Sequence, residues 1–303
     1  MRTPSAKVRA ALAIGLAALS FAAILIRYCD APAIVIAFWR MALATLVFLP
    51  VVLSKRRLGT FKALSHLSLL PYTAGAGLIL ALHFSLWIAS IQMTTIASSL
   101  LLMSAQPVWA ALLGIVFLRE PVPRRGVIAM VLAIAGIAFI AWGDFGRGAT
   151  SLIGDGLALL SGIAAAGYLT VGRRVRKRLP LTEYLTAVYG ASAIFLAAAI
   201  GLSGSAFTGY DARTWTMFIL LAVFPSAVGH SLVNYAIRHM ESYRVNLSIL
   251  VEPVVSTILA AILFAEIPGG RFYVGACLVF IGVIGAMGGG APPAATAGRL
   301  VEE

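Results

Sequence analysis

The sequence predicts an all-α membrane protein of ten transmembrane helices, arranged as two five-helix repeats of opposite orientation. Three observations predict this fold class: an apolar composition, an uneven distribution of basic residues between alternate loops, and an internal repeat. Of the 303 residues, 61% are hydrophobic and 11% are charged, whereas soluble domains have about 45–50% and about 25%. Because a membrane helix needs roughly 20 residues, the composition excludes a soluble globular protein and leaves room for about ten spans.

Five apolar segments, bounded by charged residues, proline and glycine, are the expected spans of the first half. They cover residues 8–28, 32–53, 68–90, 95–118 and 125–142. Basic residues within Lys55–Lys62 separate the second span from the third, and those within Arg119–Arg125 separate the fourth from the fifth. The connections are short, which is typical of neighbouring helices in a bundle.

The second half repeats this pattern with spans at 153–172, 181–202, 214–237, 244–264 and 272–288. The basic run Arg173–Arg178 follows the first of these and is suited to anchor the chain near anionic lipid. From Ala291 onward the chain is rich in proline and alanine. Residues 289–303 are therefore expected to form a disordered cytoplasmic tail.

Basic residues predict the orientation, because cytoplasmic loops carry an excess of lysine and arginine. With the N-terminus inside, 18 of the 23 basic residues fall in segments on the cytoplasmic side. The opposite loops hold Arg27, Arg147, Arg213 and Arg271, and Arg40 lies within the second span. Both termini are therefore expected in the cytoplasm, and the protein in a bacterial inner membrane. The same placement explains the net charge of +12 without a nucleic-acid partner.

The chain repeats itself at a nearly constant offset. His83 recurs 147 positions later as His230. Four further residues map onto positions 146 later, namely Pro107, Glu120, Ala129 and Gly136 onto Pro253, Glu266, Gly275 and Gly282, of which three pairs are identical. The matches define repeats over 8–142 and 153–288. Because each repeat holds an odd number of spans, the second lies inverted in the membrane, a design typical of secondary transporters with a substrate site near the midplane.

A motif within this repeat occurs once in each half. It reads Ala97–Pro107 followed by Leu118-Arg-Glu120-Pro in the first half, and Ser248–Pro253 followed by Phe264-Ala-Glu266 in the second. With Phe38-Trp-Arg40 in the second span, this pattern resembles the EamA-type ten-helix exporters of the drug/metabolite transporter superfamily. The resemblance covers roughly residues 8 to 288. It implies export of small metabolites, amino acids among them, by a rocking motion of the two halves.

Polar side chains at bilayer depth mark the candidate substrate site. A spacing of four places His83 and Trp87 on one face of the third span, and His230 and Asn234 on one face of the eighth. Because the two pairs are repeat equivalents, they are expected on opposite sides of a central cavity. For either histidine taken alone, a packing role is the alternative.

Glu252 lies in the ninth span, and Gln106 occupies the matching position in the fourth. Glu252 is expected to bind substrate or a proton; the alternative is a protonated side chain bonded to backbone that Pro253 leaves free. Tyr168 completes the predicted substrate-binding set of His83, Trp87, Gln106, Tyr168, His230, Asn234 and Glu252. Pro107 and Pro253 are predicted gating positions where the fourth and ninth spans bend. Arg40 is interpreted as a structural charge that pairs with a helix end or a carboxylate. A clamp for a substrate carboxylate is the alternative, although the second half has no matching basic residue.

These features favour a secondary transporter that exports small organic metabolites, possibly amino acids, by alternating access. An intramembrane enzyme acting on a lipid-borne substrate is the alternative, but it predicts an acid–base set gathered on one half. Neither a metal nor a cofactor is expected. The two cysteines, Cys29 and Cys277, cannot form a zinc site, and the sequence has no group of His, Cys and Asp residues at metal-ligand spacing. The expected partners are a small-molecule substrate and the lipid bilayer. Gly282, Gly285 and Gly288 allow close packing with a helix of the same chain or of a second protomer, so monomer and homodimer both stay open.

Overall fold

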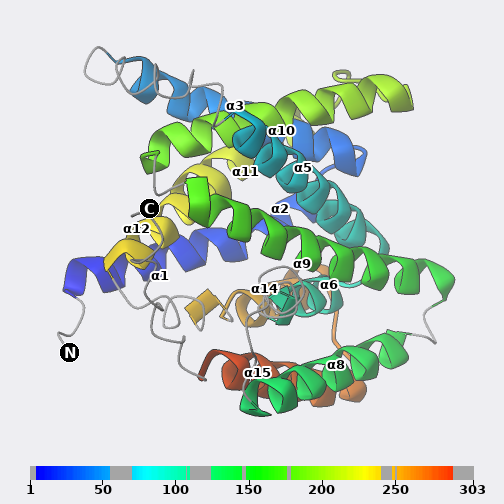
Figure 1. Cartoon of the computed structure of the whole chain (residues 1–303). Helices are drawn as coiled ribbons and strands as arrows, with labels where there is room; N and C mark the ends of the chain where they lie inside the picture. Colours follow the sequence, from blue (N-terminus) through cyan, green and yellow to red (C-terminus); the bar gives the residue numbers. More distant parts are fainter. Residues whose placement is uncertain are drawn as a thin grey trace, which may run out of the picture.

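The computed structural model describes residues 5–54, 70–106, 108–109, 124–144, 148–175, 179–239, 248–249 and 251–288. Within these ranges the chain forms helices and connecting loops, without strands. Figure 1 shows their arrangement. The helices are α1 (Ala6–Ser20), α2 (Ala22–Arg27), α3 (Ala33–Leu53), α5 (Leu70–Met93), α6 (Ile96–Met103), α8 (Arg124–Asp144), α9 (Ala149–Val175), α10 (Leu181–Ser203), α11 (Ala212–Leu221), the π-helix η2 (Ala222–His230), α12 (Ser231–His239), α14 (Val251–Phe264) and α15 (Gly270–Gly288).

Six helical segments of the described chain are long and apolar enough to cross a membrane: Ala6–Arg27, Ala33–Leu53, Leu70–Met93, Ala149–Tyr168, Leu181–Ser203 and Ala212–Val233. Three shorter apolar helices cover Met130–Trp142, Val251–Phe264 and Gly270–Gly282. The protein is therefore a multi-pass membrane protein. The second part of the predicted span 95–118, from residue 110 on, and the predicted tail 289–303 lie outside the described residues, so the count of ten spans stays a prediction.

Local sequence signals set several helix ends. The helices α3 and α10 both begin directly after a proline, Pro32 and Pro180, whose fixed φ and missing N–H suit a helix start. Asp211 caps α11, because its Oδ1 accepts a hydrogen bond from the N–H of Thr214 at 2.8 Å. Hydrogen bonding with the side chain of Thr214, together with this backbone bond, lowers the pKa of the exposed Asp211 carboxyl. Gly204 ends α10 in the left-handed conformation, with φ of 69°.

Helices from the two halves of the sequence pack against one another. The helix α3 contacts α10, α6 contacts α14, and α8 runs alongside α15 (Figure 1). In addition, α1 packs against η2 and α12, while α5 packs against α9. Each of these contacts joins one helix from residues 8–142 to one from residues 153–288. The halves are thus interleaved in a single bundle rather than folded as separate domains.

Two glycines allow the backbones of α8 and α15 to meet. A Cβ placed on Gly136 would lie 2.6 Å from the carbonyl oxygen of Gly275 and 2.7 Å from the amide nitrogen of Val279. A Cβ on Gly275 would lie 2.6 Å from Cγ1 of Ile140. Such distances are far below van der Waals contact, so only glycine fits at this crossing. In lipid the hydrophobic effect does not drive helices together, so close packing at small residues is a principal source of helix association.

Hydrogen bonds join several loops at one end of the bundle. The amide of Asp30, which precedes α3, donates to Oγ1 of Thr214 at the start of α11. Thr94, between α5 and α6, donates through its hydroxyl to Oδ1 of Asp155 on α9 at 2.9 Å. These connections belong to the set that the distribution of basic residues assigns to the outside. We call this end of the bundle the tied end.

An ion pair lies at the tied end. Nη2 of Arg27, the last residue of α2, lies 3.1 Å from Oε1 of Glu266 in the loop after α14, and it donates to the carbonyl of Thr94 at 2.9 Å. Oε2 of Glu266 accepts from the N–H of Ile96, the first residue of α6, at 3.0 Å. A carboxylate is stabilised at a helix N-terminus by the free N–H groups there. The ion pair therefore links three connecting segments: the one after α2, the one between α5 and α6, and the one after α14.

We expect Gly136→Ala to destabilise the protein by about 1–3 kcal/mol, because the added methyl group forces α8 and α15 apart. Gly75→Ala on α5 is the matched control, since a Cβ there meets nothing within 4 Å. The thermal unfolding midpoint in detergent measures both effects. It should fall for Gly136→Ala and stay constant or rise slightly for Gly75→Ala; equal shifts would contradict the close crossing.

Candidate functional site

Arg40 lies on α3 in the interior of the bundle, with 1% of its surface exposed. Its Nε donates to Oγ of Ser226 on η2 at 2.9 Å. The guanidinium carbon lies 4.1 Å from the centre of the Phe84 ring and 5.7 Å from that of Trp87, both on α5. A cation over an aromatic face is stabilised by the ring quadrupole, most strongly where water is excluded. Arg40 thus connects three helices at its guanidinium group.

Ser226 is positioned by the proline before it. Pro225 has no N–H and therefore cannot donate to the carbonyl of Leu221, four residues earlier. Oγ of Ser226 donates to that carbonyl at 3.0 Å, and its lone pairs are then free to accept from Arg40. The backbone accommodates the missing bond as a π-helix over Ala222–His230, a form that is frequent at functional sites. Sequence analysis missed Ser226, although Pro225 within the span 214–237 was the available signal.

His83 and Trp87 lie side by side on α5. Their rings are 6.3 Å apart and nearly parallel, at 8°. Nδ1 of His83 lies 2.9 Å from Oγ of Ser161 on α9, which also donates to the backbone carbonyl of His83 at 3.1 Å. This double contact fixes the imidazole against α9. Trp87 is 2% exposed, and its Nε1 has no hydrogen-bond partner among the described residues.

His230 and Glu252 approach the same region from the second half of the chain. His230 ends η2 and is close enough to Arg40 and His83 to interact electrostatically with both. Glu252 lies in the first turn of α14, is 8% exposed and interacts electrostatically with Arg40. What we call the Arg40 cluster consists of Arg40, His83, Phe84, Trp87, Ser226, His230 and Glu252. Tyr189 on α10 also interacts electrostatically with Arg40.

The remaining predicted site residues lie apart from these contacts or outside the described chain. The Tyr168 ring stacks on that of Tyr184, with centroids 6.4 Å apart, and Gln106 is half-buried just beyond α6. Asn234 lies on α12, but its side chain is outside the described part, as is the whole of Pro107. Pro253 is buried next to Glu252. A cavity lined by all seven predicted residues therefore stays a prediction.

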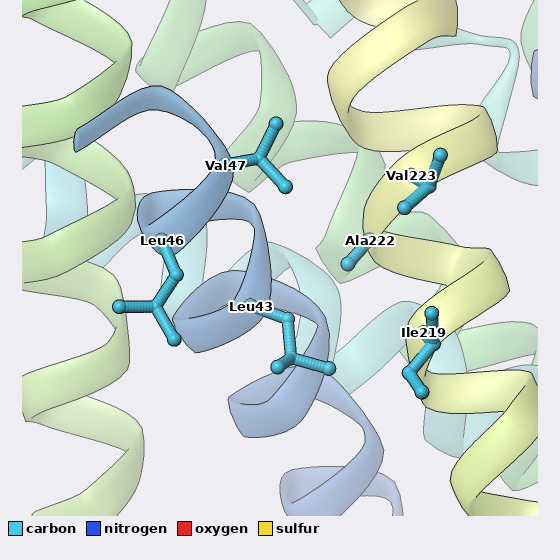
Figure 2. Close-up of a pocket in the computed structure, with 6 residues that line it drawn as sticks. All are labelled: Leu43, Leu46, Val47, Ile219, Ala222 and Val223. Carbon is cyan, nitrogen blue, oxygen red and sulfur yellow. The ribbon is translucent and has the colours of Figure 1, made fainter. Parts of the chain in front are cut away.

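A groove of about 240 Å³ lies between α3 and the α11–η2 segment. Figure 2 shows its lining, which is entirely apolar: Leu43, Leu46, Val47, Ile219, Ala222 and Val223. Leu46 and Ile219 are each more than half exposed, at 59% and 51%, so the groove opens on the lipid-facing surface. It offers no group to orient a polar solute, and we place the candidate site at the Arg40 cluster instead.

No metal site is found among the residues that the structure describes, since no three His, Cys, Asp or Glu side chains gather there. The chemistry of the Arg40 cluster is that of recognition. It combines one fixed cation, two imidazoles, an indole N–H and a carboxylate within an apolar bundle. Groups of these types can form hydrogen bonds with a polar solute.

Comparison with known proteins identifies a family. The chain is similar to two Bacillus subtilis proteins named uncharacterized transporters: YcxC, at 26% identity over 68% of this chain and 69% of YcxC, and YyaM, at 25% identity over 83% of each. An uncharacterized transporter of Archaeoglobus fulgidus is 27% identical over 59% of this chain and 63% of its own length.

One solved crystal structure superposes on the fold with a TM-score of 0.61 and 18% identity, covering 92% of this chain and 96% of the other. The model of the EamA-like transporter family matches residues 8–142 and again residues 152–288, one match for each half of the bundle. The chain belongs to the EamA-like transporter family.

Proposed function

We propose that the protein is a secondary transporter that exports small organic metabolites, amino acids among them, by alternating access between two inverted five-helix repeats. The observation that carries this proposal is the Arg40 cluster. Its members come from α3 and α5 in the first half and from η2 and α14 in the second. Buried polar groups at the interface between inverted repeats are the usual substrate site of secondary transporters.

The same placement argues against an intramembrane enzyme. Hydrolysis of a lipid-borne substrate needs an acid–base set held rigidly around one reacting atom. In the Arg40 cluster the titratable groups are instead divided between the two halves, so that a relative motion of the halves separates them. Division of this kind suits a site that opens to either side of a membrane.

The packing pattern supports an inverted repeat of ten spans. Three contacts join equivalent helices: α3 with α10, α6 with α14, and α8 with α15. The contact of α1 with α12 is matched by that of α5 with α9, because the repeat exchanges the first span with the sixth and the third with the eighth. A twofold axis relating the halves accounts for these contacts, each of which either maps onto itself or has a counterpart.

We propose further that the tied end faces outward and that both termini lie in the cytoplasm of a bacterial inner-membrane protein. The loops at the tied end are those with few basic residues. On this orientation the Arg27–Glu266 ion pair closes the outer side, and export requires that it open. The prolines Pro107 and Pro253 would then allow the fourth and ninth spans to bend between states.

Counterflow in proteoliposomes tests the function. Vesicles preloaded with unlabelled amino acids and small organic acids should accumulate the matching radiolabelled solute transiently, and protein-free vesicles should not. Retention of every labelled solute outside the vesicles, with folded protein present, would exclude transport of these classes.

We expect Glu266→Gln to open the tied end, and the native Cys29 reports on this opening. Burial raises the pKa of the Cys29 thiol to about 12, so the thiol reacts slowly with maleimide at neutral pH. A partly exposed ion pair contributes about 1 kcal/mol at most, and a loss of that size increases the open population about fivefold. The maleimide labelling rate of purified protein, in a Cys277→Ser background, should rise by about this factor.

Arg27→Gln should accelerate labelling of Cys29 in the same way. Arg9→Gln is the control, because Arg9 is exposed on α1, and its loss should leave the rate unchanged. Identical rates in Glu266→Gln and the parent protein would mean that the ion pair does not hold this end closed.

We expect Glu252→Gln to uncouple transport from protons. If the buried carboxylate carries a proton through the cycle, an imposed pH gradient should no longer drive net uptake in the variant. Solute exchange without a gradient should continue, because the amide retains the shape and hydrogen-bonding capacity of the side chain. Uptake driven by the pH gradient as in the parent protein would remove the proton-carrying role.

A further inference from the structure

The guanidinium of Arg40 has a donor that the protein leaves unused. Nε is bound to Ser226, but Nη1 is buried and has no hydrogen-bond partner among the described residues. Buried polar groups are nearly always hydrogen-bonded, and an exception calls for an explanation such as a ligand. This donor points to a missing acceptor in the middle of the bundle.

The positive charge of Arg40 is also unpaired within the described part of the chain. Tyr189 and Glu252 interact with it electrostatically, yet no carboxylate oxygen lies within ion-pair distance of the guanidinium there; the described ion pair is that of Arg27 with Glu266 at the tied end. Burying a charge without a counter-ion is costly, and in membrane spans such residues mark functional sites. The missing acceptor is therefore expected to be an anion.

The surroundings hold the guanidinium in one orientation. The Phe84 ring covers its face, with the guanidinium carbon 4.1 Å from the ring centre, and Ser226 holds the Nε edge. Arginine presents its donors in a planar fork that matches the two oxygens of a carboxylate. With one face and one edge occupied, the Nη1 edge is left to meet a ligand, without the entropy cost of ordering a flexible side chain.

We propose that Arg40 binds the carboxylate group of the transported solute through its Nη1 edge, which makes it the residue that selects small organic carboxylates, including amino acids. This inference rests on the proposed transport function and names the substrate class of the same site. The bound anion supplies both the missing acceptor and the missing counter-charge. Because Arg40 is on α3 and its anchor Ser226 is on η2, the solute is held where the two halves meet.

Matched ligands test the proposal on the wild-type protein. Thermal stabilisation of the purified protein is measured against each L-amino acid, its carboxamide and its decarboxylated amine, and against small monocarboxylates. The acids should bind, and loss of the carboxylate should weaken binding at least about tenfold, as expected for a hydrogen bond to a charged group. An amide or amine that binds as tightly as its parent acid would overturn the proposal, and so would a series in which no acid binds.

Variants add a second measurement. Arg40→Gln should lose the preference for acids over amides, and Arg40→Lys should keep part of it, because the lysine retains the charge but not the fork. Arg213→Gln removes an exposed arginine and should leave the preference unchanged. An acid preference that survives in folded Arg40→Gln would assign recognition to another group.

Counterflow separates this proposal from the proposed function. If the protein transports neutral or cationic solutes but no carboxylate, the assignment of Arg40 fails while the transport function stands. If no solute of any class is exchanged, the proposed function fails as well.

Discussion

The burial of one arginine in an apolar bundle is the constraint on which the rest of the structure depends. An arginine at the centre of a membrane helix costs about 2.5–3.5 kcal/mol on insertion scales. A charge-assisted hydrogen bond returns about 1.5–3 kcal/mol, and a desolvated cation–π contact about 2 kcal/mol. The contacts of Arg40 with Ser226 and Phe84 are therefore of the size needed to keep the side chain inside. They require α3, α5 and η2 to meet at one point.

The irregular backbone of η2 follows from the same requirement. In lipid every backbone polar group needs a partner within the protein, so a proline inside a span creates a local deficit at the carbonyl of Leu221. Ser226 meets this deficit with its hydroxyl and thereby turns its oxygen toward Arg40. A single proline thus leads to a π-helix and to an acceptor for the buried guanidinium.

The bundle contains contacts of two different strengths. At the tied end, Glu266 bridges Arg27 and the N-terminus of α6, contacts that are partly exposed and so weak enough to break during a transport cycle. The glycine crossing of α8 and α15, which also joins the two halves, excludes even a methyl group and is suited to stay intact. The proposed alternating access would use both kinds of contact between the halves, since close packing can serve as a fixed point while weak contacts break.

Composition, basic-residue distribution and the internal repeat were sufficient to predict an all-helical membrane protein, and the family was indicated by the resemblance of the repeated motif to EamA-type exporters. These properties can be read from each segment separately, because an apolar segment long enough to span lipid must form a helix to satisfy its own backbone hydrogen bonds. Repeat spacing likewise paired His83 with His230 across the centre of the bundle, because a twofold axis in the membrane plane relates equivalent positions. Glu252 was grouped with them as an ionisable residue at bilayer depth. Their joint lining of a cavity remains a prediction.

The tertiary structure decided what the sequence left open around Arg40. A carboxylate or a helix end was the expected partner, but the residues found against it are Ser226 and Phe84, 186 and 44 positions away. Neither carries a charge or stands in a motif, so nothing in their local sequence singles them out. The partner of a buried charge depends on which helices meet at its depth, and that is settled by packing between distant segments rather than by the order of residues within one.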